Sequence, residues 1–135
     1  MLHKKGTIDI SELNIPPEKH ELTTAKFFAD RGKNIKFLRP SNIKGEHTPD
    51  FIMDHIAWET KSPHGKTNRC LSDNVRDARK QSKYIIINLH RMKLPDEKCC
   101  YAIQKSLKTY RDIKCALVIT RAKKCLTFGS KSYKL

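Results

Sequence analysis

Two carboxylates and a lysine stand close together in the sequence, on either side of a short apolar segment. Asp50 precedes this segment, and Glu59 and Lys61 follow it, separated from each other by one residue. Mg²⁺ in proteins takes oxygen ligands and is often held by one or two carboxylates together with phosphates of the substrate. A lysine beside such a pair can orient water or stabilise charge that develops on a phosphate. These residue types suggest a divalent metal site at Asp50 and Glu59, with Lys61 as its catalytic partner.

The segment between the carboxylates predicts a tight β-hairpin. Residues 51–53 and 56–58 are rich in bulky apolar side chains that strands favour, and Asp54-His55 can form a two-residue turn because Asp tolerates the left-handed conformation. With this turn, Asp50 lies directly opposite Glu59. Like charges at opposed positions destabilise a hairpin, and a bound cation would reverse that effect. The alternative interpretation is a solvent-exposed hairpin face of mixed charge.

The composition indicates the class of substrate that such a site would meet. The chain has 135 residues, with 28 Lys and Arg against 14 Asp and Glu, which gives a net charge of +14. A surplus of this size favours a polyanionic partner, with nucleic acid as the first candidate and an acidic membrane surface or an acidic protein as competing possibilities. We expect no membrane span and no signal peptide, because no apolar segment has the required length or position.

The patterns around the hairpin predict one mixed α/β domain. Residues 1–16 form a lead-in that could add a short strand, residues 17–129 form the domain, and residues 130–135 form a frayed basic tail. Alternating helices and strands predict a mixed sheet with helices on both faces. The expected helices are 17–31, 67–82 and about 95–110, and the expected strands outside the hairpin are 34–38, 84–89, 115–120 and 124–128.

Two helices carry further polar residues of interest. Glu21 lies at the edge of the buried stripe of the first helix and could point toward the sheet, or it could be a surface residue favoured by the helix dipole. The second helix and its surroundings are crowded with basic residues, for which we favour contact with backbone phosphates over a merely solvated face. These residues are Arg69, Arg76, Arg79, Lys80 and Lys83.

The element order and the motif residues resemble a known nuclease superfamily. An αβββαβ core with Pro49-Asp50 on one strand and Glu59-Thr60-Lys61 on the next resembles the PD-(D/E)xK, or restriction-endonuclease-like, superfamily. Residues 17–90 further resemble the C-terminal tRNA-nuclease toxin domain of contact-dependent growth inhibition (CdiA) proteins. The segments that carry this similarity are His20-Glu21 with Ala25 and Gly32, Thr48-Pro49-Asp50, Trp58 to Pro63, and Lys80-Gln81-Ser82 before Ile85-Ile86-Ile87.

The resemblance implies a delivered or secreted toxin that cleaves tRNA in the cytoplasm of a target cell and is blocked by a cognate immunity protein. By motif, Asp50 and Glu59 would hold a divalent metal, Mg²⁺ first and Mn²⁺ or Zn²⁺ as alternatives, and Lys61 would serve the attacking water. Glu21 would join from the first helix, and Gln81 matches a polar position of the second helix. We expect a monomer with an acidic immunity partner. The segment after residue 90 matches no motif, and the turn has Asp54-His55 where a glycine is expected.

Two other functions stay open at this point. The same core serves DNA nucleases, and composition and spacing do not separate tRNA from DNA. A non-catalytic nucleic-acid-binding domain is the third interpretation, but such a domain would be expected to have lost part of the Asp50, Glu59 and Lys61 set, which is complete here.

Overall fold

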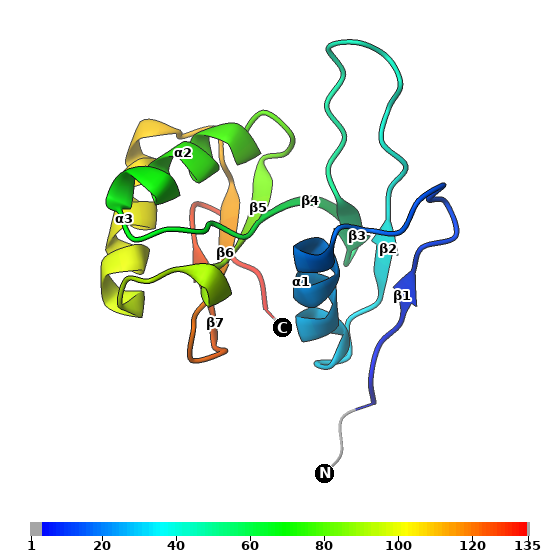
Figure 1. Ribbon diagram of the computed structural model, residues 1–135, viewed down its shortest axis with the longest axis horizontal. Helices are drawn as coiled ribbons and strands as arrows, with labels where there is room; N and C mark the ends of the chain where they lie inside the picture. The colour runs from blue at the N-terminus through cyan, green and yellow to red at the C-terminus, as the bar shows by residue number, and fades with distance from the viewer. Residues whose placement is uncertain (1–3, 135) are drawn as a thin grey trace.

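A mixed sheet crosses the whole molecule in the computed structural model, which describes residues 4–134 (Figure 1). Its seven strands lie in chain order, β1 to β7, and three α-helices and a short 3-10 helix, η1, connect them. The bounds are β1 Ile8–Asp9, α1 Lys19–Ala29, β2 Ile35–Phe37, β3 Phe51–Met53, β4 Ile56–Lys61, α2 Asn68–Ala78, β5 Tyr84–Asn88, η1 Leu89–Arg91, α3 Asp96–Thr109, β6 Cys115–Ile119 and β7 Cys125–Phe128.

Strands β4, β5 and β6 run parallel in the middle of the sheet. Strand β3 pairs antiparallel with β4, and β7 pairs antiparallel with β6. Parallel strands need a long crossover, which α2 supplies between β4 and β5 and α3 supplies between β5 and β6. The carboxyl ends of the three parallel strands therefore meet at one edge of the sheet.

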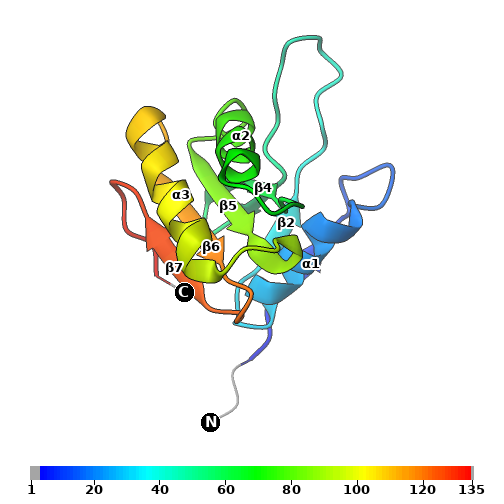
Figure 2. The ribbon, with the colours of Figure 1, turned by 60° about the vertical axis from the view of Figure 1, so that its left-hand side comes forward.

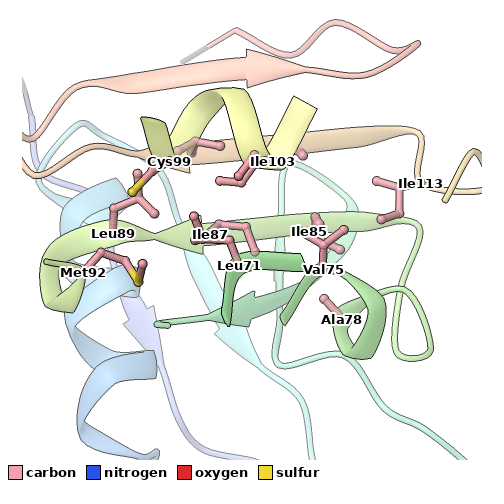
Figure 3. Close-up of a cluster of buried hydrophobic side chains, with 13 residues drawn as sticks. Leu71, Val75, Ala78, Ile85, Ile87, Leu89, Met92, Cys99, Ile103 and Ile113 are labelled. Carbon is pink, nitrogen blue, oxygen red and sulfur yellow. The ribbon is translucent and has the colours of Figure 1, made fainter. Parts of the chain in front are cut away.

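Helices cover both faces of this sheet, as predicted. Phe28 of α1 packs with Trp58 and Ile86 on one face. Residues of α2 and α3 pack against Ile85 and Ile87 on the other face, where Leu71, Val75 and Ile103 fill the space between helices and sheet (Figure 3). Strand β5 is apolar on both sides because both of its faces are covered, and this explains its continuous run of isoleucines.

The hairpin has the predicted turn and register. Asp54 and His55 have φ angles of 53° and 64°, the left-handed values that a two-residue turn of this kind needs. Phe51 lies opposite Trp58 and Met53 opposite Ile56. The paired register ends at Phe51 and Trp58; just beyond it, the backbone N–H of Asp50 donates to the carbonyl of Trp58 over 2.9 Å, and the carboxylate of Asp50 lies near that of Glu59.

The two ends of the chain are more ordered than expected. Strand β1, within the lead-in, pairs with β2, as we thought possible. The prediction of a frayed tail was wrong for residues 130–134: the ring of Tyr133 packs against Trp58 with centroids 5.2 Å apart, and its hydroxyl donates to Asp54 over 2.6 Å. The half-buried ring of Tyr133 and its hydrogen bond hold the basic tail against the hairpin. Leu135 lies outside the described residues.

No helix within residues 4–134 has the length and apolar character that crossing a membrane requires.

Candidate active site

A small polar cavity of about 260 Å³ lies at the carboxyl end of β4, beside the first turn of α1. It is lined by residues of α1, β4, α2 and η1, which are far apart in the sequence. They are Glu18, His20, Glu21, Glu59, Thr60, Lys61, Ser62, Asn74 and Arg91. Three of the residues predicted from sequence, Glu21, Glu59 and Lys61, thus line one cavity.

Glu59 is the most unusual residue of the cavity. Its side chain is 8% exposed, its Oε2 lies 3.5 Å from the ammonium of Lys61, and its Oε1 is buried without a hydrogen-bond partner. Burial raises the pKa of Glu59 to about 8; the nearby Asp50 carboxylate adds to the rise, and Lys61 opposes it. A buried carboxylate is normally paired or bonded to a metal, and the position of Glu59 Oε1 suits a metal ligand.

Asp50 is held in place by the neighbouring strand. Its Oδ2 accepts hydrogen bonds from the backbone N–H of Thr60 over 2.9 Å and from the Thr60 hydroxyl over 2.7 Å. These two bonds fix the direction of the carboxylate. They also give Asp50 a structural role that the sequence analysis did not foresee.

Glu21 joins the two carboxylates from α1. It is the third residue of a capping box: Glu18 accepts hydrogen bonds from the N–H groups of His20 and Glu21, and Glu21 Oε1 accepts from the N–H of Glu18 over 3.2 Å. Burial raises the pKa of Glu21 to about 7, and the carboxylate of Asp50 adds to the rise. Glu21 is therefore both a helix-capping residue and a member of the carboxylate cluster, so the two interpretations of its role are compatible.

Three further residues of the cavity were missed by the sequence analysis. Arg91 donates through Nη2 to the carbonyl of Ser62 over 2.6 Å, and its Nε is buried without a partner, as is Nδ1 of His20. The amide nitrogen of Asn74 donates to the carbonyl of Cys70 over 2.8 Å. The position of Arg91 just after β5 was a usable signal, since ligands bind outside the carboxyl ends of parallel strands. His20 stands beside Glu21 in the motif already noted.

The donor set fits a divalent cation that is shared with a substrate. Within residues 4–134, no three His, Cys, Asp or Glu side chains are arranged to hold an ion together. Mg²⁺ in proteins is commonly bound by one or two carboxylates, and phosphate or water completes its coordination shell. Asp50 and Glu59 would supply these two carboxylates. The unpartnered Glu59 oxygen and the repulsion among the carboxylates are the observations of this structure that favour such an ion.

Comparison with protein families matches residues 46–125, more than half of the chain, to the contact-dependent growth inhibition CdiA C-terminal domain. The chain belongs to this family. It is therefore the toxin domain of a contact-dependent growth inhibition protein. The matched region contains Asp50, Glu59 and Lys61, whereas Glu21 lies before it.

The fold of this CdiA C-terminal domain also occurs among solved structures. A chain of the CdiA-CT/CdiI toxin and immunity complex from Burkholderia pseudomallei superposes with a TM-score of 0.62 at 17% identity, over 92% of this chain and 99% of that chain. This similarity shows a shared fold, including the segments after residue 90 that matched no motif. A search of the curated proteins found no match.

Gln81 of the CdiA C-terminal domain does not line the cavity. Helix α2 ends at Ala78, earlier than predicted, and Gln81 lies in the turn toward β5. The next residue, Ser82, donates to the carbonyl of Ala57 near the start of β4, whereas the cavity lies at the end of that strand. Asn74, about two helical turns earlier, is the α2 residue that reaches the cavity. The geometry thus favours Asn74 over Gln81 for a polar role.

The basic residues predicted to bind nucleic acid are largely paired within the protein. Arg76 contacts both Asp73 and Asp77 at 3.3 Å, and the guanidinium of Arg79 donates to Asp112 over 3.0 Å. Arg69 and Lys80 are 3.9 Å from Asp73 and Asp77, respectively. Lys83 is exposed just before β5 and has no ion pair within 4 Å among the described residues, although it helps to lower the pKa of Asp112. Phosphate contact by this set stays a prediction, but four of its five members already have an acidic neighbour.

Proposed function

We propose that this domain is a divalent-metal-dependent nuclease of the PD-(D/E)xK type that cleaves tRNA in the cytoplasm of the target cell. The observation that carries the proposal is the buried, unpartnered oxygen of Glu59 in a cavity shared with Glu21 and Lys61 and bordered by Asp50. Three neighbouring carboxylates that raise the pKa of Glu21 and Glu59 are unfavourable for folding and suit a site for metal-assisted phosphodiester hydrolysis.

Each side chain then has a role that follows from its position. Asp50 and Glu59 would hold the metal, which would supply Lewis-acid polarisation of the phosphate and activation of water. Lys61 Nζ, beside Glu59, and the guanidinium of Arg91 would stabilise negative charge on the phosphate. The Glu21 carboxylate, with a pKa near 7, can accept a proton from water at neutral pH. Gln81 has no place in this scheme.

A folded RNA suits the surroundings of the site. An apolar cavity of about 640 Å³ adjoins the catalytic cavity and shares Glu21 with it, and Leu13, Ile15 and Phe37 contribute to its walls. Unpaired bases of RNA pack into such surfaces, and proteins recognise them in loops and at ends. The strong positive charge of the chain also suits the phosphate backbone of an RNA.

An immunity protein is the partner that the proposed activity requires. A nuclease that cleaves tRNA must be neutralised in the cell that makes it, and the solved relative is described as a toxin and immunity complex. We propose a cognate immunity protein of acidic character that binds a monomeric toxin, because complementary charge would speed association with a protein of net charge +14.

The experiment that tests the activity compares two substrates. Purified protein is incubated with total tRNA and, separately, with supercoiled plasmid, in Mg²⁺, Mn²⁺ or Zn²⁺ and in EDTA, beside the Glu59→Gln variant. Discrete tRNA fragments that need metal and Glu59, with intact plasmid, support the proposal. Nicked plasmid with untouched tRNA would replace it with a DNA nuclease, and an active Glu59→Gln variant would refute the site.

A further inference from the structure

A second and strongly basic cavity of about 570 Å³ lies between α1 and the turn that joins β6 to β7. Figure 2 shows this turn, in orange, next to the blue helix α1. Lys26, Arg31, Arg121 and Lys123 stand around the cavity, and within residues 4–134 none of them has an acidic partner within 4 Å. The acidic residue of its lining, Asp30, pairs instead with Lys5 at 3.8 Å. These four cations contrast with those of α2, which are mostly paired.

The walls of this cavity are fixed by hydrogen bonds. Arg31 donates through Nη1 to the carbonyl of Phe27 over 2.8 Å and through Nη2 to the carbonyl of Lys123 over 3.3 Å, which ties the end of α1 to the β6–β7 turn. The carboxylate of Asp96 accepts from the backbone N–H of Arg121 over 2.8 Å and so fixes the turn to α3. The basic groups are thus presented by a backbone that is already ordered, which lowers the entropy lost when a ligand binds.

The basic cavity adjoins the catalytic one. His20 lines the catalytic cavity, His90 lines the basic cavity, and their rings are in contact with centroids 5.2 Å apart. Beneath them, the buried amide of Asn88 donates to the Thr24 hydroxyl over 3.1 Å and joins β5 to α1. The two cavities therefore meet at this pair of histidines.

We propose that the basic cavity binds backbone phosphates of the nucleic-acid strand that flanks the cleaved bond. This inference rests on the proposed function. The apolar cavity on the other side of the site is less suited to phosphate, because Glu18, Glu21 and Asp50 lie in its wall. The strand then places its phosphates on Lys26 and Arg121 on one side of the metal site and its bases in the apolar cavity on the other.

Binding without cleavage tests this subsite. The Lys26→Ala/Arg121→Ala variant is chosen because both side chains are exposed and neither makes a hydrogen bond within the described residues, whereas Arg31 supports the fold. Its matched control is Lys108→Ala/Lys114→Ala, which removes two exposed charges near the opposite end of β6. Affinity for end-labelled total tRNA is measured in EDTA by fluorescence anisotropy across a range of salt concentrations, and circular dichroism checks the fold. The milder Lys26→Gln/Arg121→Gln variant is made in parallel.

We expect the Lys26/Arg121 variant to bind tRNA about tenfold or more weakly, with a salt slope smaller by about 1.5, since each phosphate contact contributes about 0.7 to 0.9. The control should keep the slope of the parent. If the parent binds and cleaves tRNA but the Lys26/Arg121 variant binds as tightly as the control, this inference is refuted and the proposed function stands. A parent that binds no tRNA at low salt would overturn the proposed function and this inference with it.

Discussion

Replacing Glu59 with glutamine should stabilise the metal-free protein, although it should abolish catalysis. Glutamine has nearly the same shape and carries no charge, so it removes the buried ionisable group without opening a cavity. In the folded protein, burial and the Asp50 carboxylate raise the pKa of Glu59 from 4.5 to about 8. The folded state therefore holds a proton that the unfolded state releases, and this difference opposes folding wherever the unfolded glutamate is ionised.

The size and sign of the effect depend on pH. Below the unfolded pKa of 4.5, both states are protonated and the variant gains nothing. As pH rises, the parent loses about 1.4 kcal/mol for each pH unit, or about 3 kcal/mol by pH 7, and the loss levels off near 5 kcal/mol above the folded pKa of about 8. The advantage of Glu59→Gln should therefore grow from weakly acidic to weakly alkaline solution.

Urea unfolding in EDTA at several pH values, followed by circular dichroism, measures this advantage. Glu97→Gln, at an exposed position in the first turn of α3, is the control and should show no comparable gain. An advantage of Glu59→Gln that is the same in weakly acidic and weakly alkaline buffer would refute the reasoning, because it would show that Glu59 ionises as easily in the folded protein as in the unfolded chain.

Three other predictions follow from the same geometry. Adding Mg²⁺ or Mn²⁺ at neutral pH should raise the midpoint of thermal unfolding of the parent but not of Glu59→Gln, and an equal rise in both would place the ion elsewhere. The Arg76→Ala/Arg79→Ala variant should lower the salt slope of tRNA binding by less than the Lys26→Ala/Arg121→Ala variant does. The reason is that aspartates already neutralise the two arginines; these are Asp73, Asp77 and Asp112. A larger decrease for the arginine variant in the same titration would show that α2 is the main surface for phosphate binding. Expression of the chain alone should arrest growth and deplete intact tRNA on gels, whereas normal growth at verified soluble levels would count against the toxin activity.

The hairpin and its opposed carboxylates could be predicted because the information is local. A turn at Asp54-His55 fixes the pairing of the residues on both sides, and a one-residue shift would move every side chain to the other face. Phe51, Met53 and Trp58 share one buried face, so the alternation along both strands puts Asp50 and Glu59 together on the opposite face. The position of Glu21 followed in the same way from the buried stripe of its helix.

The rest of the site depends on where distant segments meet. Arg91 reaches the cavity because η1 is held to the loop after β4 through the carbonyl of Ser62, a contact across 29 positions that no local pattern encodes. Gln81 was expected at the site because the apolar pattern does not show that α2 ends at Ala78. The end of the helix determines which of its residues can face the end of β4. Tyr133 likewise packs against Trp58 from the far end of the chain.

The distribution of acidic residues explains how a polyanion can approach a site made of carboxylates. On α2, aspartates neutralise the arginines, so much of the surplus positive charge lies elsewhere. Glu18, Glu21 and Glu59 line the catalytic cavity and repel phosphate when they are ionised, whereas the adjoining cavity presents unpaired cations such as Lys26 and Arg121. A strand held by those cations would bring a phosphate to the carboxylates at the position where a divalent ion has to bridge them. The metal would offset the repulsion between phosphate and carboxylates, and the phosphate would supply a further oxygen ligand to the metal, so their binding to this domain would be cooperative.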